Sequence, residues 1–163
     1  MAVTTLNTAP IFTETPKVSG TILPAVAATA QNNSQGNGTI GGATPNMFLA
    51  FSAGADGSYL QKVRFTLSGA TANVASTAAV LRVYVSTVNT GSTTSADTWL
   101  IQEVNAAVQT PNVVTTLTGA TYPIDIPLNF AIPSGYYLLV GISAVSTVAN
   151  SPVWVVTTYG GDY

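Results

Sequence analysis

The chain has 163 residues, enough for one domain with a sizeable core, and 47% of them are hydrophobic. Four Lys and Arg and six Asp and Glu make up only 6% of the chain, against about 25% in an ordinary soluble domain. Cysteine and histidine are absent, which excludes disulfides, thiolate chemistry and histidine-based catalysis or metal ligation.

The scarcity of charge bears on the partners that the chain can have. Thr, Ser, Asn, Gln and Gly fill the polar positions, and such a surface has little electrostatic repulsion and low side-chain entropy, so another protein covers it readily. The basic residues are too few and too scattered for strong phosphate binding, so we expect no nucleic acid partner. They are Lys17, Lys62, Arg64 and Arg82, of which Lys62 and Arg64 can share one strand face.

Neither a signal peptide nor a membrane span is expected. The first residues, 1–6, lack a basic and a long apolar region, and no apolar run approaches the roughly 18 residues of a membrane span. A virion component, made in the host cytoplasm, fits an extracellular-looking composition without an export signal. A secreted chain whose leader has been removed fits equally well.

Residues 1–45 are rich in Thr, Asn, Gly and Pro, and residues 31–38 contain no apolar side chain, which indicates a solvated loop. Short extended pieces are expected at 9–15 and 21–29, confined to edges by proline. We interpret residues 1–45 as an extended N-terminal arm and loop that packs on a neighbouring subunit through Ile11 and Phe12. A first strand pair with a loop is the alternative.

Residues 46–163 show better strand signals. Apolar residues alternate with polar ones over 47–52, 62–68 and 81–86, the period-2 pattern of a sheet with one face in water. Residues 89–95 read as a loop. The segment 97–108 fits either a helix or a strand, and strand is favoured because its neighbours are strands.

The last third alternates most clearly. Over 122–130, Pro123 and Pro127 share one face, which predicts an exposed edge strand. A turn at 133–135 leads into a strand over 136–145, and a second turn at 148–152 leads into a strand over 153–159. About eight strands without a helix predict an all-β, antiparallel β-sandwich of jelly-roll or Greek-key type, with an open barrel as the alternative.

The residues give little support for catalysis or for a cofactor. No base is placed to activate a Ser or Thr hydroxyl, and the spacing of the six carboxylates does not suggest a catalytic pair. Asp56, in the sequence GADGS, resembles half of a calcium loop, but a β-turn explains Asp-Gly more simply. We therefore expect a protein that is not an enzyme and has no cofactor and no metal.

The aromatic residues are candidates for contacts with a partner. Trp154 alternates with valines and faces either the core or a partner, while Tyr159 and Tyr163 flank a Gly-Gly pair that suggests a flexible tail docked on a subunit. We take Trp154, Tyr159 and Tyr163 as candidate subunit or capsid contacts. Alternatively, exposed Trp and Tyr stack on sugar rings, which would make the chain a carbohydrate-binding module or the receptor-binding head of a fibre protein, with a glycan as the ligand.

In overall style, the chain resembles small structural proteins of tailed bacteriophages. The likeness lies in the Thr/Asn/Gly-rich N-terminal segment, the Thr/Ala/Val strands, the pattern IPSGYYLLVGIS at 132–143 and the ending YGGDY at 159–163. Capsid decoration (cement) proteins of that class sit on the outer shell, often as trimers, and clamp neighbouring capsid subunits. The resemblance implies a homotrimer in the virion, bound to the major capsid protein or another virion protein, without nucleic acid or membrane. Head-fibre and tail-fibre domains are similar in composition.

Overall fold

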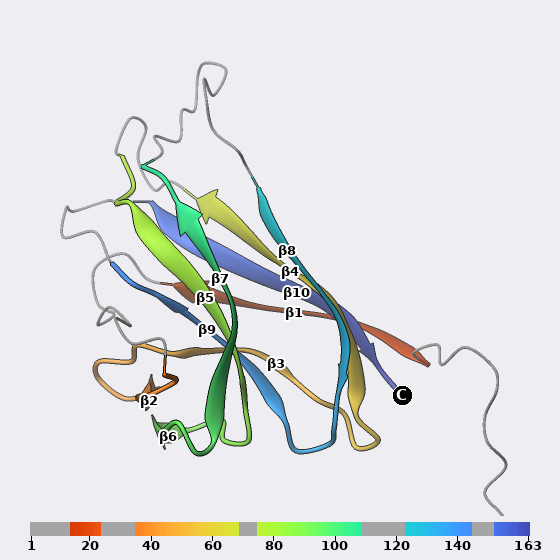
Figure 1. The fold of residues 1–163 in the computed structure, drawn as a ribbon. Helices are drawn as coiled ribbons and strands as arrows, with labels where there is room; N and C mark the ends of the chain where they lie inside the picture. Colours follow the sequence, from red (N-terminus) through yellow and green to blue (C-terminus); the bar gives the residue numbers. More distant parts are fainter. Residues whose placement is uncertain (1–13, 24–34, 69–74, 109–122, 145–151) are drawn as a thin grey trace, which may run out of the picture.

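The computed structural model describes residues 14–23, 35–68, 75–108, 123–144 and 152–163. In these residues the chain forms strands and no helix (Figure 1). The strands are β1 (Thr15–Leu23), β2 (Gly38–Ile40), β3 (Phe48–Ser52), β4 (Ser58–Ser68), β5 (Ala79–Ser86), β6 (Gly91–Thr93), β7 (Thr98–Ala106), β8 (Ile124–Ile132), β9 (Tyr137–Ile142) and β10 (Val153–Asp162).

The eight longer strands form two four-stranded antiparallel sheets that face one another (Figure 1). Sheet I has the order β1-β10-β4-β8, and sheet II has the order β3-β9-β5-β7. Most connections pass from one sheet to the other, and the first and last strands lie side by side in sheet I. This arrangement is a jelly roll, as the sequence predicted.

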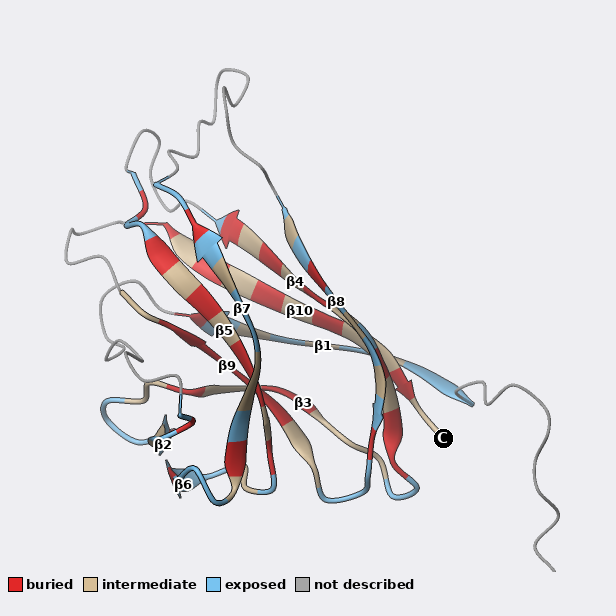
Figure 2. Ribbon diagram, viewed as in Figure 1, coloured by how far each residue is buried: buried red, intermediate tan, exposed pale blue. Residues whose placement is uncertain are grey.

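The core lies between the two sheets and follows from the alternation in the sequence. In β4, Val63, Phe65 and Leu67 are buried while the residues between them are half-buried. They pack against inward-facing residues of sheet II such as Val83 and Val140. Figure 2 shows this alternation along β4 and β10. Full burial of one such side chain contributes roughly 1.5–3 kcal/mol, so this cluster is the main source of the sandwich's stability.

Strand β8 is an edge strand, which confirms the prediction from its prolines. Pro127 lies opposite Lys62, next to an irregularity in the pairing with β4, and Asn129 has a positive φ of 53°. A proline and a local bend leave this edge poorly suited to pairing with a further strand.

The outer face of sheet II is partly covered, which corrects two expectations. Residues 89–95 were predicted to be a loop, but β6 forms within them and pairs with β2 into a two-stranded ribbon. Ile40 and Met47 pack there against Tyr84 of β5 and Leu139 of β9 in a second hydrophobic cluster. The outward side of β5, expected to face water, is therefore buried at Tyr84.

Strand β1 lies within the segment that was predicted to be an arm. It forms one continuous strand, paired with β10 over its whole length, and Leu23 reaches the core. The sequence suggested two short pieces at 9–15 and 21–29, whereas β1 runs through Pro16, which an edge strand tolerates. The described part of residues 1–45 thus supplies β1 and β2 to the fold, whereas residues 1–13 and 24–34 lie outside the described residues.

Candidate binding surface

The outer face of sheet I carries exposed hydrophobic side chains. On β1, Leu23 points into the core, so Val18 and Ile22 point outward, and they are 66% and 54% exposed. Val155 of β10 also points outward, because its neighbours Trp154 and Val156 are buried. The β2–β6 ribbon covers part of the equivalent face of sheet II, around Tyr84 and Leu139, so the two faces of the sandwich differ.

The register of the strands brings these side chains together. Ile22 lies opposite Val155, and Val18 lies opposite Tyr159 on the same face. We call these four residues the apolar stripe. Solvent-exposed aliphatic side chains contribute little to the fold, so the stripe is available for a contact with another molecule.

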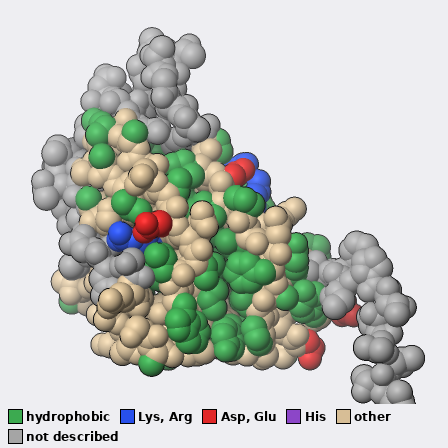
Figure 3. All heavy atoms as spheres, viewed as in Figure 1, with side chains coloured by type: hydrophobic (Ala, Val, Ile, Leu, Met, Phe, Trp, Pro, Cys, Tyr) green, Lys and Arg blue, Asp and Glu red, His purple; other side chains and the backbone are tan. Residues whose placement is uncertain are grey.

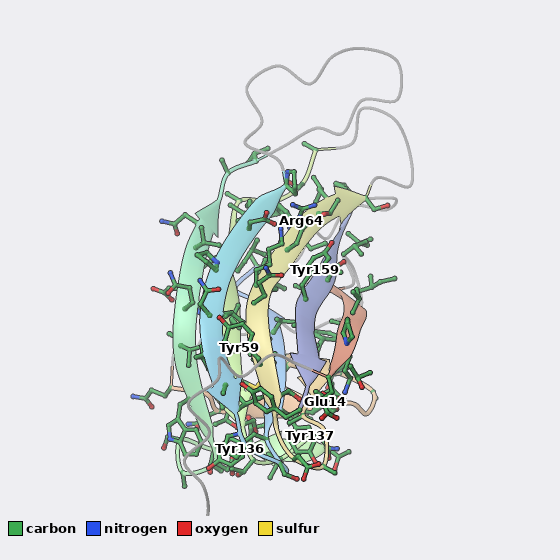
Figure 4. The ribbon with its side chains drawn as sticks, turned by 90° about the vertical axis from the view of Figure 1, so that its right-hand side faces the viewer. Glu14, Tyr59, Arg64, Tyr136, Tyr137 and Tyr159 are labelled. Carbon is green, nitrogen blue, oxygen red and sulfur yellow. The ribbon has the colours of Figure 1, made fainter. Side chains whose placement is uncertain are left out.

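Beside the apolar stripe lies a charged group that we call the Tyr159 cluster, consisting of Tyr159, Lys62, Arg64 and Asp125. Lys62 is the register partner of Tyr159 on β4, and Arg64 is the register partner of Asp125 on β8. Arg64 donates to Asp125 from Nε (2.7 Å) and Nη2 (2.8 Å), and Lys62 Nζ donates to Asp125 Oδ2 (3.1 Å). Lys62 Nζ lies 5.1 Å and Arg64 Cζ lies 6.0 Å from the centre of the Tyr159 ring, within cation–π range. Figure 4 shows Arg64 and Tyr159 on neighbouring strands of this face.

The cluster carries a net charge of about +1 at neutral pH, since two cations share one carboxylate. Hydrogen bonding from Arg64, with a further contribution from Lys62, lowers the pKa of Asp125 to about 2 against the opposing effect of desolvation. Asp125 is therefore ionised at neutral pH. The same hydrogen bond raises the pKa of Arg64 above its usual value.

This cluster holds the excess positive charge of the chain. The other two basic residues are each paired with a carboxylate, namely Lys17 with Asp162 and Arg82 with Glu103. The remaining carboxylates are Glu14, Asp56 and Asp97, so the chain's net charge of −2 is the sum of +1 and −3.

Within the described residues, no group of three or more acidic side chains is placed to hold a metal ion. The described part of the chain also contains no helix that is long and apolar enough to span a membrane.

The predicted contact residues fall in different places. Trp154 is 3% exposed and belongs to the core, so its side chain is not on the surface, which resolves the choice between core and partner that the sequence left open. Tyr159 lies on the outer face of sheet I. Tyr163 is half-buried, and its backbone N–H donates to the carbonyl of Gly57 (3.2 Å). Ile11 and Phe12 lie outside the described residues.

The Gly-Gly pair between the two tyrosines is not a flexible tail. Gly160 and Gly161 are part of β10 and pair with both β1 and β4. A Cβ on Gly160 would come within 2.4 Å of the carbonyl oxygen of Tyr59. Glycine is therefore required there by the close approach of two backbones, because no side chain fits.

The apolar stripe was missed by the sequence interpretation. Its signal was the alternation of Val18, Gly20 and Ile22 with polar residues, which resembles a buried strand face but points outward. The shared face of Lys62 and Arg64 was predicted from their spacing, but their convergence on Asp125 and Tyr159 was not.

Hydrophobic side chains also gather along the open side of the sandwich between β7 and β8 (Figure 3). Ile101 and Val104 of β7 and Leu128 and Phe130 of β8 are half-buried there and pack against the core. Packing at the margin of the core accounts for this group, unlike the apolar stripe, whose β1 residues extend into solvent.

No protein family, curated protein or solved structure matches the chain.

Proposed function

We propose that the chain is a non-enzymatic structural protein of a virion, a capsid decoration protein that binds the outer shell through the outer face of sheet I. The observation that carries the proposal is the apolar stripe on a sheet face that nothing in the described part of the chain covers. On sheet II, the part of the equivalent face around Tyr84 and Leu139 is covered by the β2–β6 ribbon.

The energetics of such a surface favour a protein partner. Burying a mostly exposed aliphatic side chain contributes roughly 1–2 kcal/mol, so Val18 and Ile22 together supply a useful but modest part of an affinity. Because the stripe lies on a paired sheet, little conformational entropy is lost on binding. A protein that binds only the assembled shell stabilises that shell by mass action.

Two further features support the same proposal. Jelly rolls occur in viral capsid proteins, although a fold alone does not determine function. The chain also resembles small structural proteins of tailed phages in composition and strand style. The proposed partner is the major capsid protein or another virion protein, and the proposed assembly on the shell is a homotrimer.

A glycan ligand receives less support from the described residues. Trp154 is buried, and Lys62 and Arg64 lie over the ring of Tyr159, so that ring is less free to stack on a sugar. Trp99, which is 42% exposed on β7, is the remaining tryptophan and lies on the other sheet.

The test is co-sedimentation of the purified chain with capsids of the virus that encodes it, prepared without the chain. We expect saturable binding and a higher melting temperature of the shells. Changing Val18→Ser and Ile22→Ser together should weaken binding about tenfold or more, because the apolar contact is lost.

The matched control is Val108→Ser, which removes a similarly exposed valine (58%) two residues beyond the end of β7. Val108→Ser should bind capsids as tightly as the unchanged chain does. The control and the Val18→Ser/Ile22→Ser variant should both have the melting temperature of the unchanged chain. The proposal would be contradicted if the unchanged chain did not bind capsids, or if the control lost as much capsid affinity as the double variant.

A further inference from the structure

We infer that the Tyr159 cluster is a docking site for an acidic side chain of the partner protein, an Asp or Glu carboxylate that sits beside apolar residues. This inference rests on the proposed function only in taking a protein as the partner that covers this face.

The donors needed for a second carboxylate are present. Asp125 accepts from Nε and Nη2 of Arg64 and from Lys62 Nζ. This leaves Nη1 of Arg64 and the other protons of the Lys62 ammonium group without a carboxylate. One excess positive charge matches one incoming negative charge, so binding would neutralise the cluster.

The cations are also held in place before binding. Asp125 fixes the guanidinium group of Arg64 through two hydrogen bonds, and the ring of Tyr159 lies against both cations. A donor that is already ordered loses less side-chain entropy when it binds. Glu14, the carboxylate just before β1, lies toward the other end of this face from Arg64 (Figure 4).

The surroundings favour a protein carboxylate over other anions. The register places Val18 next to Tyr159 and Ile22 next to Val155, so the incoming carboxylate would be flanked by aliphatic contacts, as in the core of a protein interface. A phosphate carries more negative charge than the cluster can neutralise, and strong phosphate binding uses several cations. An acidic sugar would also supply a carboxylate, but its hydroxyl-rich ring matches the aliphatic side chains of Val18 and Ile22 less well.

The site can be tested without a capsid. Two peptides, acetyl-Val-Glu-Val-amide and acetyl-Val-Gln-Val-amide, are each titrated into the isotope-labelled full chain. The amide chemical shifts of the chain are recorded at each step. We expect concentration-dependent shifts at residues 62, 64 and 157–159 with the Glu peptide only, and their loss in Arg64→Gln. Equal responses to the two peptides, or no response, would overturn the inference.

The same titration with sialyllactose and with lactose tests whether the carboxylate that binds belongs to an acidic sugar. Shifts at these residues that are larger with sialyllactose than with the Glu peptide would assign the site to an acidic sugar and reject a protein carboxylate. Self-association of the free chain that Arg64→Gln abolishes would assign it to a second copy and equally reject the inference.

A matched pair of variants extends the test to capsids. Arg64 and Arg82 each lie directly opposite a carboxylate, but on opposite sheets. Arg64→Gln should weaken capsid binding about fivefold and reduce its sensitivity to salt, whereas Arg82→Gln should leave both unchanged once normalised to folded protein.

The two proposals fail separately in this design. Loss of binding in Val18→Ser/Ile22→Ser but not in Arg64→Gln would refute the acidic docking site and leave the capsid proposal standing. If the unchanged chain does not bind capsids, the capsid proposal fails, and the peptide titration still decides whether a carboxylate binds at Tyr159.

Discussion

Lys17 Nζ lies 3.1 Å from Oδ2 of Asp162, so the first described strand is joined by an ion pair to the last. The same ammonium group donates to the carbonyl oxygen of Ser52 (2.7 Å) and lies 4.7 Å from the centre of the Phe51 ring. Ser52 and Phe51 belong to β3, whereas Lys17 and Asp162 belong to sheet I. One side chain therefore joins the two sheets at the β1–β3 edge.

Replacing Lys17 with Met should destabilise the fold by about 1 kcal/mol, because the interactions are charge-assisted but the side chain remains one-third exposed. Methionine keeps the contact with Phe51 and removes only the charge. The measurement is chemical denaturation. Lys62→Met is the matched control, since Asp125 keeps Arg64 as a partner, and should cost less than about 0.5 kcal/mol. Equal losses would mean that the Lys17 contacts do not hold the sheets together.

Replacing Thr158 with valine should make the protein more stable. The Thr158 side chain is fully buried in β10, and its hydroxyl has no hydrogen-bond partner in the described part of the chain. Valine has nearly the same shape without the hydroxyl, so Thr158→Val should raise the free energy of unfolding by about 1 kcal/mol, or the melting temperature by roughly 3 °C.

The matched substitution Thr93→Val should lower the free energy of unfolding instead of raising it. The hydroxyl of Thr93 is also buried, but it donates to the carbonyl oxygen of Gly36 (2.6 Å). Its removal leaves a buried acceptor unpaired and should cost about 1–2 kcal/mol. If both variants were destabilised alike, the hydroxyl of Thr158 would have a partner that the geometry does not indicate.

The parts of the fold that depend on local pattern could be predicted from the sequence. Alternation located the strands around Val63 and Ile126, and Pro127 marked an edge. Pro133 and Gly135 marked a turn, which is closed by a hydrogen bond from Tyr136 N–H to the Pro133 carbonyl (3.2 Å). Each of these signals lies within a few residues of its effect.

The parts that depend on distant pairing could not. Strand β6 forms because Gly91–Thr93 pairs with Gly38–Ile40, and no local sequence pattern predicts that pairing. Alternation showed that Trp154 and its valine neighbours face opposite sides, but not which side was the core. The Tyr159 cluster likewise needed the registers of β4, β8 and β10 before Lys62, Arg64 and Asp125 could be brought together.

Gly160→Ala should destabilise the protein by about 3 kcal/mol, or roughly 8 °C in melting temperature. The added Cβ would overlap the backbone oxygen of Tyr59, and neither strand can move without disturbing the centre of sheet I. Gly42→Ala is the control: Gly42 has a φ of 78° but open space around it, so only backbone strain of about 1 kcal/mol is expected. If Gly160→Ala lost no more stability than Gly42→Ala, β10 would end before residue 160 in solution.

Stability should be flat from about pH 5 to pH 9 and fall on either side, because no histidine titrates between. On the acid side, hydrogen bonding lowers the pKa of Asp125 to about 2, through Arg64 above all, and the backbone N–H of Thr94 lowers that of Asp97. Burial alone would raise the pKa of Asp162, but hydrogen bonds from Ser58 and Lys17 outweigh it and lower the pKa. These carboxylates stabilise the fold above their unfolded pKa of about 3.9, and the contribution is lost as the pH falls through the folded values.

On the alkaline side the relevant group is Tyr84, whose pKa burial raises to about 12. Its contribution is present below the unfolded pKa of about 10 and is lost as the pH rises toward 12. Denaturation midpoints measured from pH 2 to pH 11.5 test both limbs. Asp162→Asn should flatten part of the acid limb, and Tyr84→Phe should flatten the alkaline limb while leaving the acid limb unchanged. An alkaline limb that persists in Tyr84→Phe would show that a group other than Tyr84 is responsible.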